Sequence, residues 1–266
     1  MQYFSQTDYN TFSGEKPFLN DNRIQKERNK VRQKLLNLDS QLWPFIQYKK
    51  WDLHRHRNPD YYVSSILFAG FSAKKRWRTF AHTGMWLHYG KSSEQLDYFK
   101  QIDGICIKGQ FERELYNAFY LHTRIEFLIN SKVFKCSLVL ATNKNYLDKS
   151  EFLRKIRFRK GASEKLLELM ESLFEKNFFY EIGKERFYLT CNQIQEEEEK
   201  STEEEMSIPE KLLKFIKSDK QGVYSSIIKE YEPSYPALDE NNIVNEMKEN
   251  LELLYPVYNF MAWRPS

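Results

Sequence analysis

Two apolar runs on either side of a short polar turn constrain the fold of this chain more than any other pattern. The runs lie within residues 123–140 and flank Asn130-Ser131-Lys132, a connection short enough to join paired antiparallel strands. In the first run, apolar side chains alternate with Arg124, Glu126 and Leu128, so Ile125 and its i+2 neighbours fall on one face. The pattern therefore predicts a β-hairpin.

Similar strand patterns occur on both sides of this hairpin. Residues 61–89 indicate two strands separated by the polar segment 72–78, and Gly84 indicates a bulge or the close approach of another backbone. A second hairpin is predicted around Gly183-Lys184. Hairpins rather than βαβ units predict an α+β fold, with an antiparallel or mixed sheet, flanking helices and a C-terminal helical segment.

Helical periodicity predicts the flanking helices. The first is expected from about Asn20 to Leu42, with Asp21 or Asn22 as its N-cap. A last helix is expected from Asp239, and Pro256 must kink or end it. Further helices are expected over residues 92–101, 149–159, 163–176 and 208–218.

Charge is distributed unevenly along the chain. The whole protein carries a formal net charge of +4, but residues 196–205 contain seven Glu and one Lys, which leaves about +12 on residues 1–195. We expect a basic α+β domain over residues 1–195 and an acidic linker over residues 196–206. Residues 207–266 are expected to form a helical segment packed on the main domain.

Several classes of protein are disfavoured by composition. No apolar run approaches the length of roughly 18 residues that spans a bilayer, and the N-terminus has no apolar signal region. Cys106, Cys136 and Cys191 show no CxxC spacing. Gly-rich phosphate loops are missing from the sequence. We therefore expect a cytoplasmic protein with no membrane partner and no cofactor.

Cations and aromatic side chains are concentrated in residues 43–91. This stretch holds four of the five Trp, four of the five His and nine Lys/Arg against two acids. Such a mixture is suited to holding phosphates and stacking on bases, and it is also typical of an aromatic core with a solvated basic rim. Trp77, between Arg76 and Arg78, is predicted to be an exposed stacking ring, and Trp86 a core residue.

A second basic cluster covers residues 152–160, with five basic residues and no acid. Separate basic clusters together favour nucleic acid as a ligand more than either alone. The predicted nucleic-acid contacts are Lys49, Lys50, Arg55, Arg57, Lys74, Lys75, Arg76, Trp77, Arg78, Arg154, Lys155 and Arg157.

Catalytic and metal-binding patterns are weak. In a strand, Asp52, His54 and His56 would share one face, which would suit a metal ion, but solvated or phosphate-contacting histidines are the favoured interpretation. No acid–x–Lys triplet sits where a restriction-type nuclease needs one. No catalytic and no metal-binding residue is therefore predicted.

These observations favour a nucleic-acid-binding protein that catalyses no reaction by itself. It would serve as a specificity or accessory subunit of a DNA- or RNA-processing or defence assembly. Two alternatives stay open: a protein-interaction subunit that docks an acidic partner, and a metal-dependent nucleic-acid hydrolase.

Overall fold

The computed structural model describes residues 1–55, 66–72, 80–92, 94–95, 122–140, 147–182, 185–187 and 225–262. Within these ranges, seven strands form one sheet in the order β1-β2-β3-β4-β7-β5-β6. The strands are β1 (Ile66–Ser72), β2 (Phe80–Tyr89), β3 (Arg124–Asn130), β4 (Phe134–Leu140), β5 (Phe179–Ile182), β6 (Glu185–Phe187) and β7 (Ser225–Tyr231). Three neighbouring pairs, β1–β2, β5–β6 and β5–β7, are antiparallel. The sheet and its helices confirm the predicted α+β fold.

The helices of the described residues are α1 (Gln6–Asn10), α2 (Asn22–Tyr48), α5 (Leu147–Phe158), α6 (Ala162–Phe174) and α9 (Ile243–Met261), with short 3-10 turns η1 (Lys16–Phe18) and η2 (Pro236–Leu238). The Asp21 side chain caps α2 by accepting hydrogen bonds from the amides of the second and third following residues, as predicted. Both long helices continue through a proline, at Pro44 in α2 and at Pro256 in α9. In α2 the turn beyond Pro44 is retained because Ile46 is fully buried.

The chain divides into two compact units. The described parts of residues 1–89, 126–136 and 230–252 form unit 1, and those of residues 90–125, 137–229 and 253–266 form unit 2. Strands β3, β4 and β7 and helix α9 each contribute residues to both units.

The predicted acidic linker, residues 196–206, lies outside the described residues, so this part of the domain division stays a prediction. Residues 207–266 were expected to be helical. The described part of that segment contains the strand β7 as well as α9.

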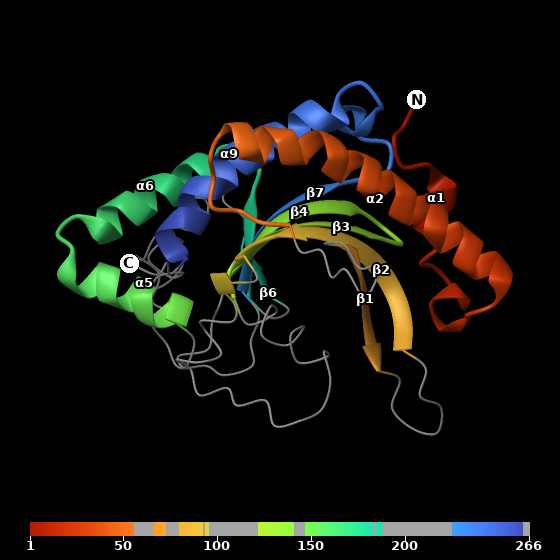
Figure 1. Cartoon of the computed structure of the whole chain (residues 1–266), viewed down its shortest axis with the longest axis horizontal. Coiled ribbons are helices and arrows are strands. Elements are labelled where there is room, and N and C mark those ends of the chain that lie inside the picture. The colour runs from red at the N-terminus through yellow and green to blue at the C-terminus, as the bar shows by residue number, and fades with distance from the viewer. Residues whose placement is uncertain are drawn as a thin grey trace, which may run out of the picture. The chain divides into compact units, whose positions relative to one another are not determined.

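A row of four aromatic side chains forms the centre of unit 1. Tyr89, Phe127, Phe134 and Tyr231 come from β2, β3, β4 and β7, and each is at most 1% exposed. Successive ring centroids lie 6.2, 6.5 and 6.5 Å apart. Phe4 stacks on Phe134 at 5.1 Å. Figure 1 shows α2 running along one face of the curved strands of this unit.

The two tyrosines at the ends of this row attach it to two helices. The Tyr89 hydroxyl donates to Asp39 of α2 over 2.8 Å, and the Tyr231 hydroxyl donates to Glu246 of α9 over 2.6 Å. The Asn250 amide, also on α9, donates to the Tyr231 oxygen. Burial is the main cause that raises the pKa of both tyrosines, so both phenols stay protonated donors.

Gly84 occupies a crowded position in β2. Ala69 pairs with Gly84 and Gly70 with His82, so Thr83 is the extra residue of a bulge. A Cβ atom on Gly84 would lie 2.7 Å from the Ile129 carbonyl oxygen of β3. Both expectations for this glycine, a bulge and a close backbone approach, are confirmed.

Trp86, predicted to be a core residue, is only partly exposed but is not among the fully buried core residues. Along β2, Met85, Leu87 and Tyr89 are fully buried on one face, and the other face carries Trp86, of intermediate exposure, and the buried His88. The apolar sequence around Trp86 therefore indicates a buried strand, but the Trp86 side chain lies on the face of β2 opposite to Met85 and Leu87. There its ring centroid lies 6.3 Å from that of His88.

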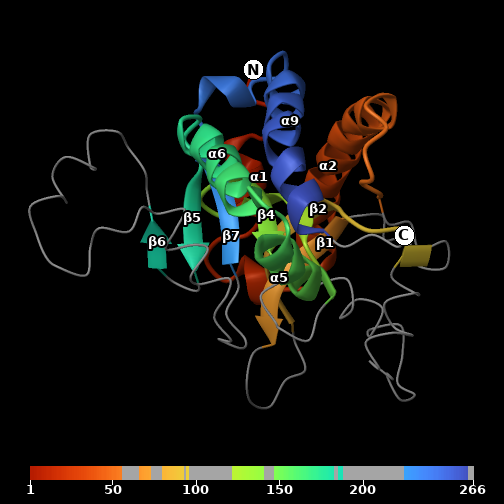
Figure 2. The same cartoon turned by 90° about the vertical axis from the view of Figure 1, so that its left-hand side faces the viewer.

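Unit 2 contains the second predicted hairpin and the helix pair α5–α6. Tyr180 of β5 pairs with Phe187 of β6, which confirms a hairpin around residues 183–184. Helix α6 buries the apolar stripe formed by Leu166, Met170 and Leu173. Figures 1 and 2 show α5 and α6 as consecutive helices of this unit.

Candidate nucleic-acid interface

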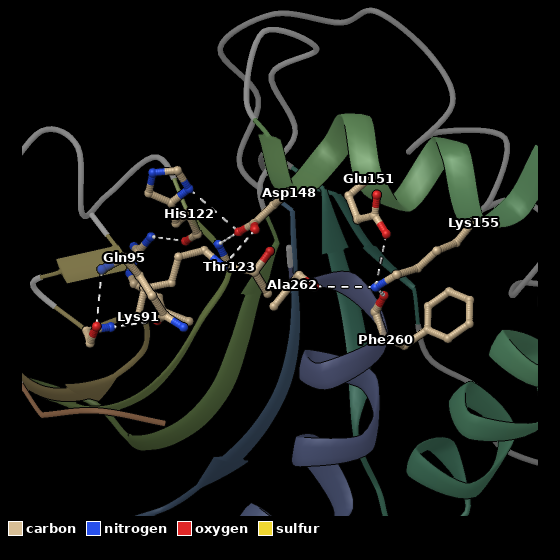
Figure 3. Close-up of polar contacts among 11 residues, drawn as sticks. Lys91, Gln95, His122, Thr123, Asp148, Glu151, Lys155, Phe260 and Ala262 are labelled. Atoms are coloured by element: carbon tan, nitrogen blue, oxygen red, sulfur yellow. Dashed lines mark hydrogen bonds and ion pairs between the residues drawn. The ribbon is translucent and has the colours of Figure 1, made fainter. Parts of the chain in front are cut away.

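A buried ion-pair cluster holds the first turn of α5 in unit 2 (Figure 3). One carboxylate oxygen of Asp148 lies 2.9 Å from the Lys91 ammonium nitrogen. The other accepts a 2.9 Å hydrogen bond from the Thr123 amide and lies 3.7 Å from Nδ1 of His122. The side chains of Lys91, His122 and Asp148 are all at most 3% exposed. The cluster thus joins the chain after β2, the chain before β3 and the start of α5.

Charge compensation explains how this carboxylate tolerates burial. Burial alone would raise the pKa of Asp148, but the neighbouring Lys91 ammonium and the His122 imidazole outweigh it and hold that pKa below its usual range. Asp148 is therefore ionised at neutral pH. Sequence reasoning missed this cluster, because its members are far apart in the chain and carry no recognisable spacing.

Lys155 fixes α5 at a second point. Its ammonium donates to the carbonyl oxygens of Phe260 and Ala262, at 2.8 and 3.3 Å, at the C-terminal end of α9. The Phe152 ring packs edge-on against that of Phe260, with centroids 6.1 Å apart. A cation at a helix C-terminus is favoured by the helix dipole and by the unpaired last carbonyls. Lys155, a predicted nucleic-acid contact, thus has internal partners.

Arg154, another predicted contact, also has an internal partner. Its guanidinium donates to both carboxylate oxygens of Glu151, over 2.6 and 2.7 Å. This hydrogen bonding is the main cause that lowers the pKa of Glu151. The side chain of Arg154 itself is 54% exposed, so its pair is at the surface and part of its positive charge is neutralised there.

The last turn of α5 and the two residues after it carry exposed cations. Arg157, Arg159 and Lys160 are exposed, and so is the Phe158 ring, at 72%. The Arg157 guanidinium lies 5.6 Å from the centroid of that ring. Among the ion pairs of the described residues, none involves these three cations. We call residues 157–160 the α5 tip.

Two predicted contacts near the C-terminus of α2 have partners within unit 1. Lys49 forms a 2.6 Å ion pair with Glu252 of α9. Arg55 lies 3.0 Å from Asp39 and 4.9 Å from the centre of the Trp43 ring.

Lys50 differs from these two lysine and arginine neighbours. Its side chain is exposed, and its backbone is in the left-handed region, at φ 53°. It takes part in no ion pair described for this part of the chain.

The other predicted contacts, Arg57, Lys74, Lys75, Arg76, Trp77 and Arg78, lie outside the described residues. Their contribution to an interface stays a prediction, as does that of the six contacts that the structure does describe.

The structure describes two of the three residues of the weak metal-binding pattern, Asp52 and His54. Nε2 of His54 lies 2.8 Å from a carboxylate oxygen of Asp52, whereas His56 lies outside the described residues. Across the described ranges, no group of three His, Cys, Asp or Glu side chains is arranged to hold a metal ion.

Comparison with known proteins adds no family relationship: no protein-family model and no curated protein matches this chain. Among the described helices, none combines the length and the apolar character needed to cross a membrane.

Proposed function

We propose that this protein binds nucleic acid and catalyses no reaction by itself. The observation that carries the proposal is the α5 tip, where three exposed cations and one exposed aromatic ring occupy four consecutive residues. As part of the proposal, the protein acts as a specificity or accessory subunit of a DNA- or RNA-processing or defence assembly. That role rests on the basic composition and on the lack of a recognisable catalytic motif.

The chemistry of the tip suits a phosphate backbone with accessible bases. Phosphates attract cations and release condensed counterions when they are neutralised, which favours binding most at low salt. An aromatic ring beside the cations adds stacking on an unpaired base, which is tolerant of sequence. Phe158 is 72% exposed, so stacking would cover apolar surface that the folded protein leaves in water.

The anchoring of α5 supports the same proposal. Asp148 fixes the first turn through Lys91 and His122, and Lys155 fixes the helix from its other end. A helix held at two points presents Arg157 and Phe158 from a rigid support. Less conformational entropy is then lost when a ligand binds.

The test is a salt titration of binding to duplex and single-stranded DNA and RNA. The variant Arg157→Ala/Arg159→Ala/Lys160→Ala should bind more weakly and with a slope of log affinity against log salt that is smaller by about one per lost contact. The matched control is Lys132→Ala/Lys165→Ala/Lys176→Ala, which removes the same charge from exposed positions elsewhere. Its affinity should stay closer to that of the unmodified protein.

The other outcomes decide between the remaining classes. Cleavage of any of the four nucleic acids that requires a divalent metal would replace the proposal with a hydrolase. Failure to bind all four at low salt would overturn it and favour an acidic protein partner. If the variant and its control lost equal affinity, the effect would be one of net charge alone. The α5 tip would then not be part of the interface.

A further inference from the structure

The exposed face of α2 carries a row of amide side chains. Gln25, Asn29, Gln33, Asn37 and Gln41 follow one another at four-residue intervals, and all five are exposed. Because a helix turns about 100° per residue, each step moves the row by about 40° around the axis. Three consecutive members, Asn29, Gln33 and Asn37, therefore lie within one side of the helix. Their face is opposite to the buried one, which includes Val31, Leu35 and Leu38.

No exposed carboxylate interrupts this face. The two acids of α2 are both engaged: Glu27 pairs with Lys16 at 2.6 Å, and the buried Asp39 binds Arg55 and Tyr89. On the exposed side, Lys26 and Lys30 lie one turn apart next to the amide row. A long helix with lysines and amides but no exposed acid is electrostatically complementary to a polyanion.

We infer that the exposed face of α2 binds in the major groove of duplex DNA and that Asn29, Gln33 and Asn37 contact base edges there. This inference rests on the proposed nucleic-acid binding and names its ligand. Asn and Gln side chains match the adjacent donor and acceptor of adenine in the major groove, while lysines on the flank reach phosphates. The B-form groove is wide enough for a helix, whereas the major groove of duplex RNA is too narrow.

The local structure of α2 favours this use. In the free protein the Gln33 amide donates to the Asn37 side-chain oxygen over 3.0 Å. This bond uses neither the Gln33 side-chain oxygen, an acceptor, nor the Asn37 amide nitrogen, a donor, so both can bind a base edge. Phe45 in the last turn of α2 and the following C-cap residue Lys49 contact Lys248 and Glu252 of α9. The stretch from Asn29 to Asn37 lies more than one turn before that contact.

The experiment selects bound sequences from a random 30-base-pair duplex DNA pool. The unmodified protein should enrich a motif that contains adenines, and Asn29→Ala/Gln33→Ala/Asn37→Ala should lose the enrichment, with discrimination against a mutated motif falling about tenfold or more. Its salt-dependent affinity for the unselected pool should change by less than about threefold, because no charge is removed. Alanine favours the helix, so folding should be retained and is checked by circular dichroism.

A matched control removes exposed amides outside α2. Gln6 and Asn10 form the same kind of amide pair, at 3.1 Å, so the control is Gln6→Ala/Asn10→Ala/Asn245→Ala. It should keep the motif. The inference is overturned, and the proposed function stands, if the protein binds DNA without enriching any motif, or if the motif survives the α2 variant. Absence of binding to every nucleic acid would overturn the proposed function itself.

Discussion

The Tyr89 hydroxyl donates a hydrogen bond of 2.8 Å to a buried carboxylate, that of Asp39, and so links β2 to α2. The second oxygen of Asp39 lies 3.0 Å from the Arg55 guanidinium. One acid therefore serves two donors from different parts of unit 1. This relationship gives Arg55 a structural role that is separate from any contact with nucleic acid.

Replacement of Arg55 should therefore affect folding more than binding. Arg55→Ala leaves the buried Asp39 with one donor and removes the cation from the Trp43 ring, so the free energy of unfolding should fall by about 2–3 kcal/mol. Lys50→Ala is the control, because Lys50 is exposed and should change stability by at most about 0.5 kcal/mol. Urea denaturation of both variants measures this. Equal stability of the two would show that the Arg55–Asp39 pair contributes nothing.

A side chain at residue 84 should strain the junction between β2 and β3. In Gly84→Ala the new Cβ would lie 2.7 Å from the Ile129 carbonyl oxygen, a backbone atom that cannot rotate away. The strands must shift, and we expect a loss of about 1–3 kcal/mol in thermal or urea unfolding. An unchanged melting temperature would mean that the bulge at Thr83 absorbs the added methyl group.

Removal of the Asp148 carboxylate should destabilise unit 2 in a pH-dependent way. Asp148→Asn removes the carboxylate that pairs with the buried Lys91 ammonium, which costs about 3–5 kcal/mol at pH 7. The folded protein holds the pKa of Asp148 below the unfolded value of about 3.9, so this stabilisation is complete above that value and is lost as the pH falls below it. The difference between the two proteins should shrink in acid.

A double variant serves as the control for this cluster. Lys91→Met/Asp148→Asn removes both charges and should be less destabilised than Asp148→Asn alone. Equal stability of the single and double variants at pH 7 would contradict the ion-pair explanation.

His82 should make folding sensitive to mild acid. Burial, and secondarily the Arg28 cation, lower its pKa to about 4, against about 6.5 in an unfolded chain. Between these values the unfolded chain binds the proton and the folded protein does not, so stability is complete above pH 6.5 and falls as the pH drops toward 4. The urea midpoint of His82→Gln should decline less over that range. Parallel declines would assign the sensitivity to other groups.

Local chemistry made much of this fold predictable. The Asp21 cap, the turn at Asn130 and the crowded Gly84 each depend on residues that are close in the chain or on backbone constraints of one position. Strand β7 was not predicted, because its place between β4 and β5 depends on pairing across long sequence separations.

The internal partners of the basic residues were beyond sequence reasoning. Lys155 and Arg157 are two positions apart in the same basic run, yet Lys155 caps the end of α9 and Arg157 is exposed. Whether a cation faces water or an acceptor is decided by distant residues, here Phe260 and Ala262. The Lys91–Asp148–His122 cluster depends in the same way on three separate segments.

The basic segment around Trp77, which lies outside the described residues, should extend the proposed interface. Lys74→Ala/Lys75→Ala/Arg76→Ala/Arg78→Ala should weaken nucleic-acid binding to a similar degree for all sequences. Each lost phosphate contact should reduce the salt slope by roughly one, because fewer counterions are released. Fluorescence anisotropy at several salt concentrations measures both quantities. If both segments contact one ligand, combination with the α5-tip substitutions should reduce the salt slope further. An unchanged salt slope in the four-residue variant would show that this segment is not part of the interface.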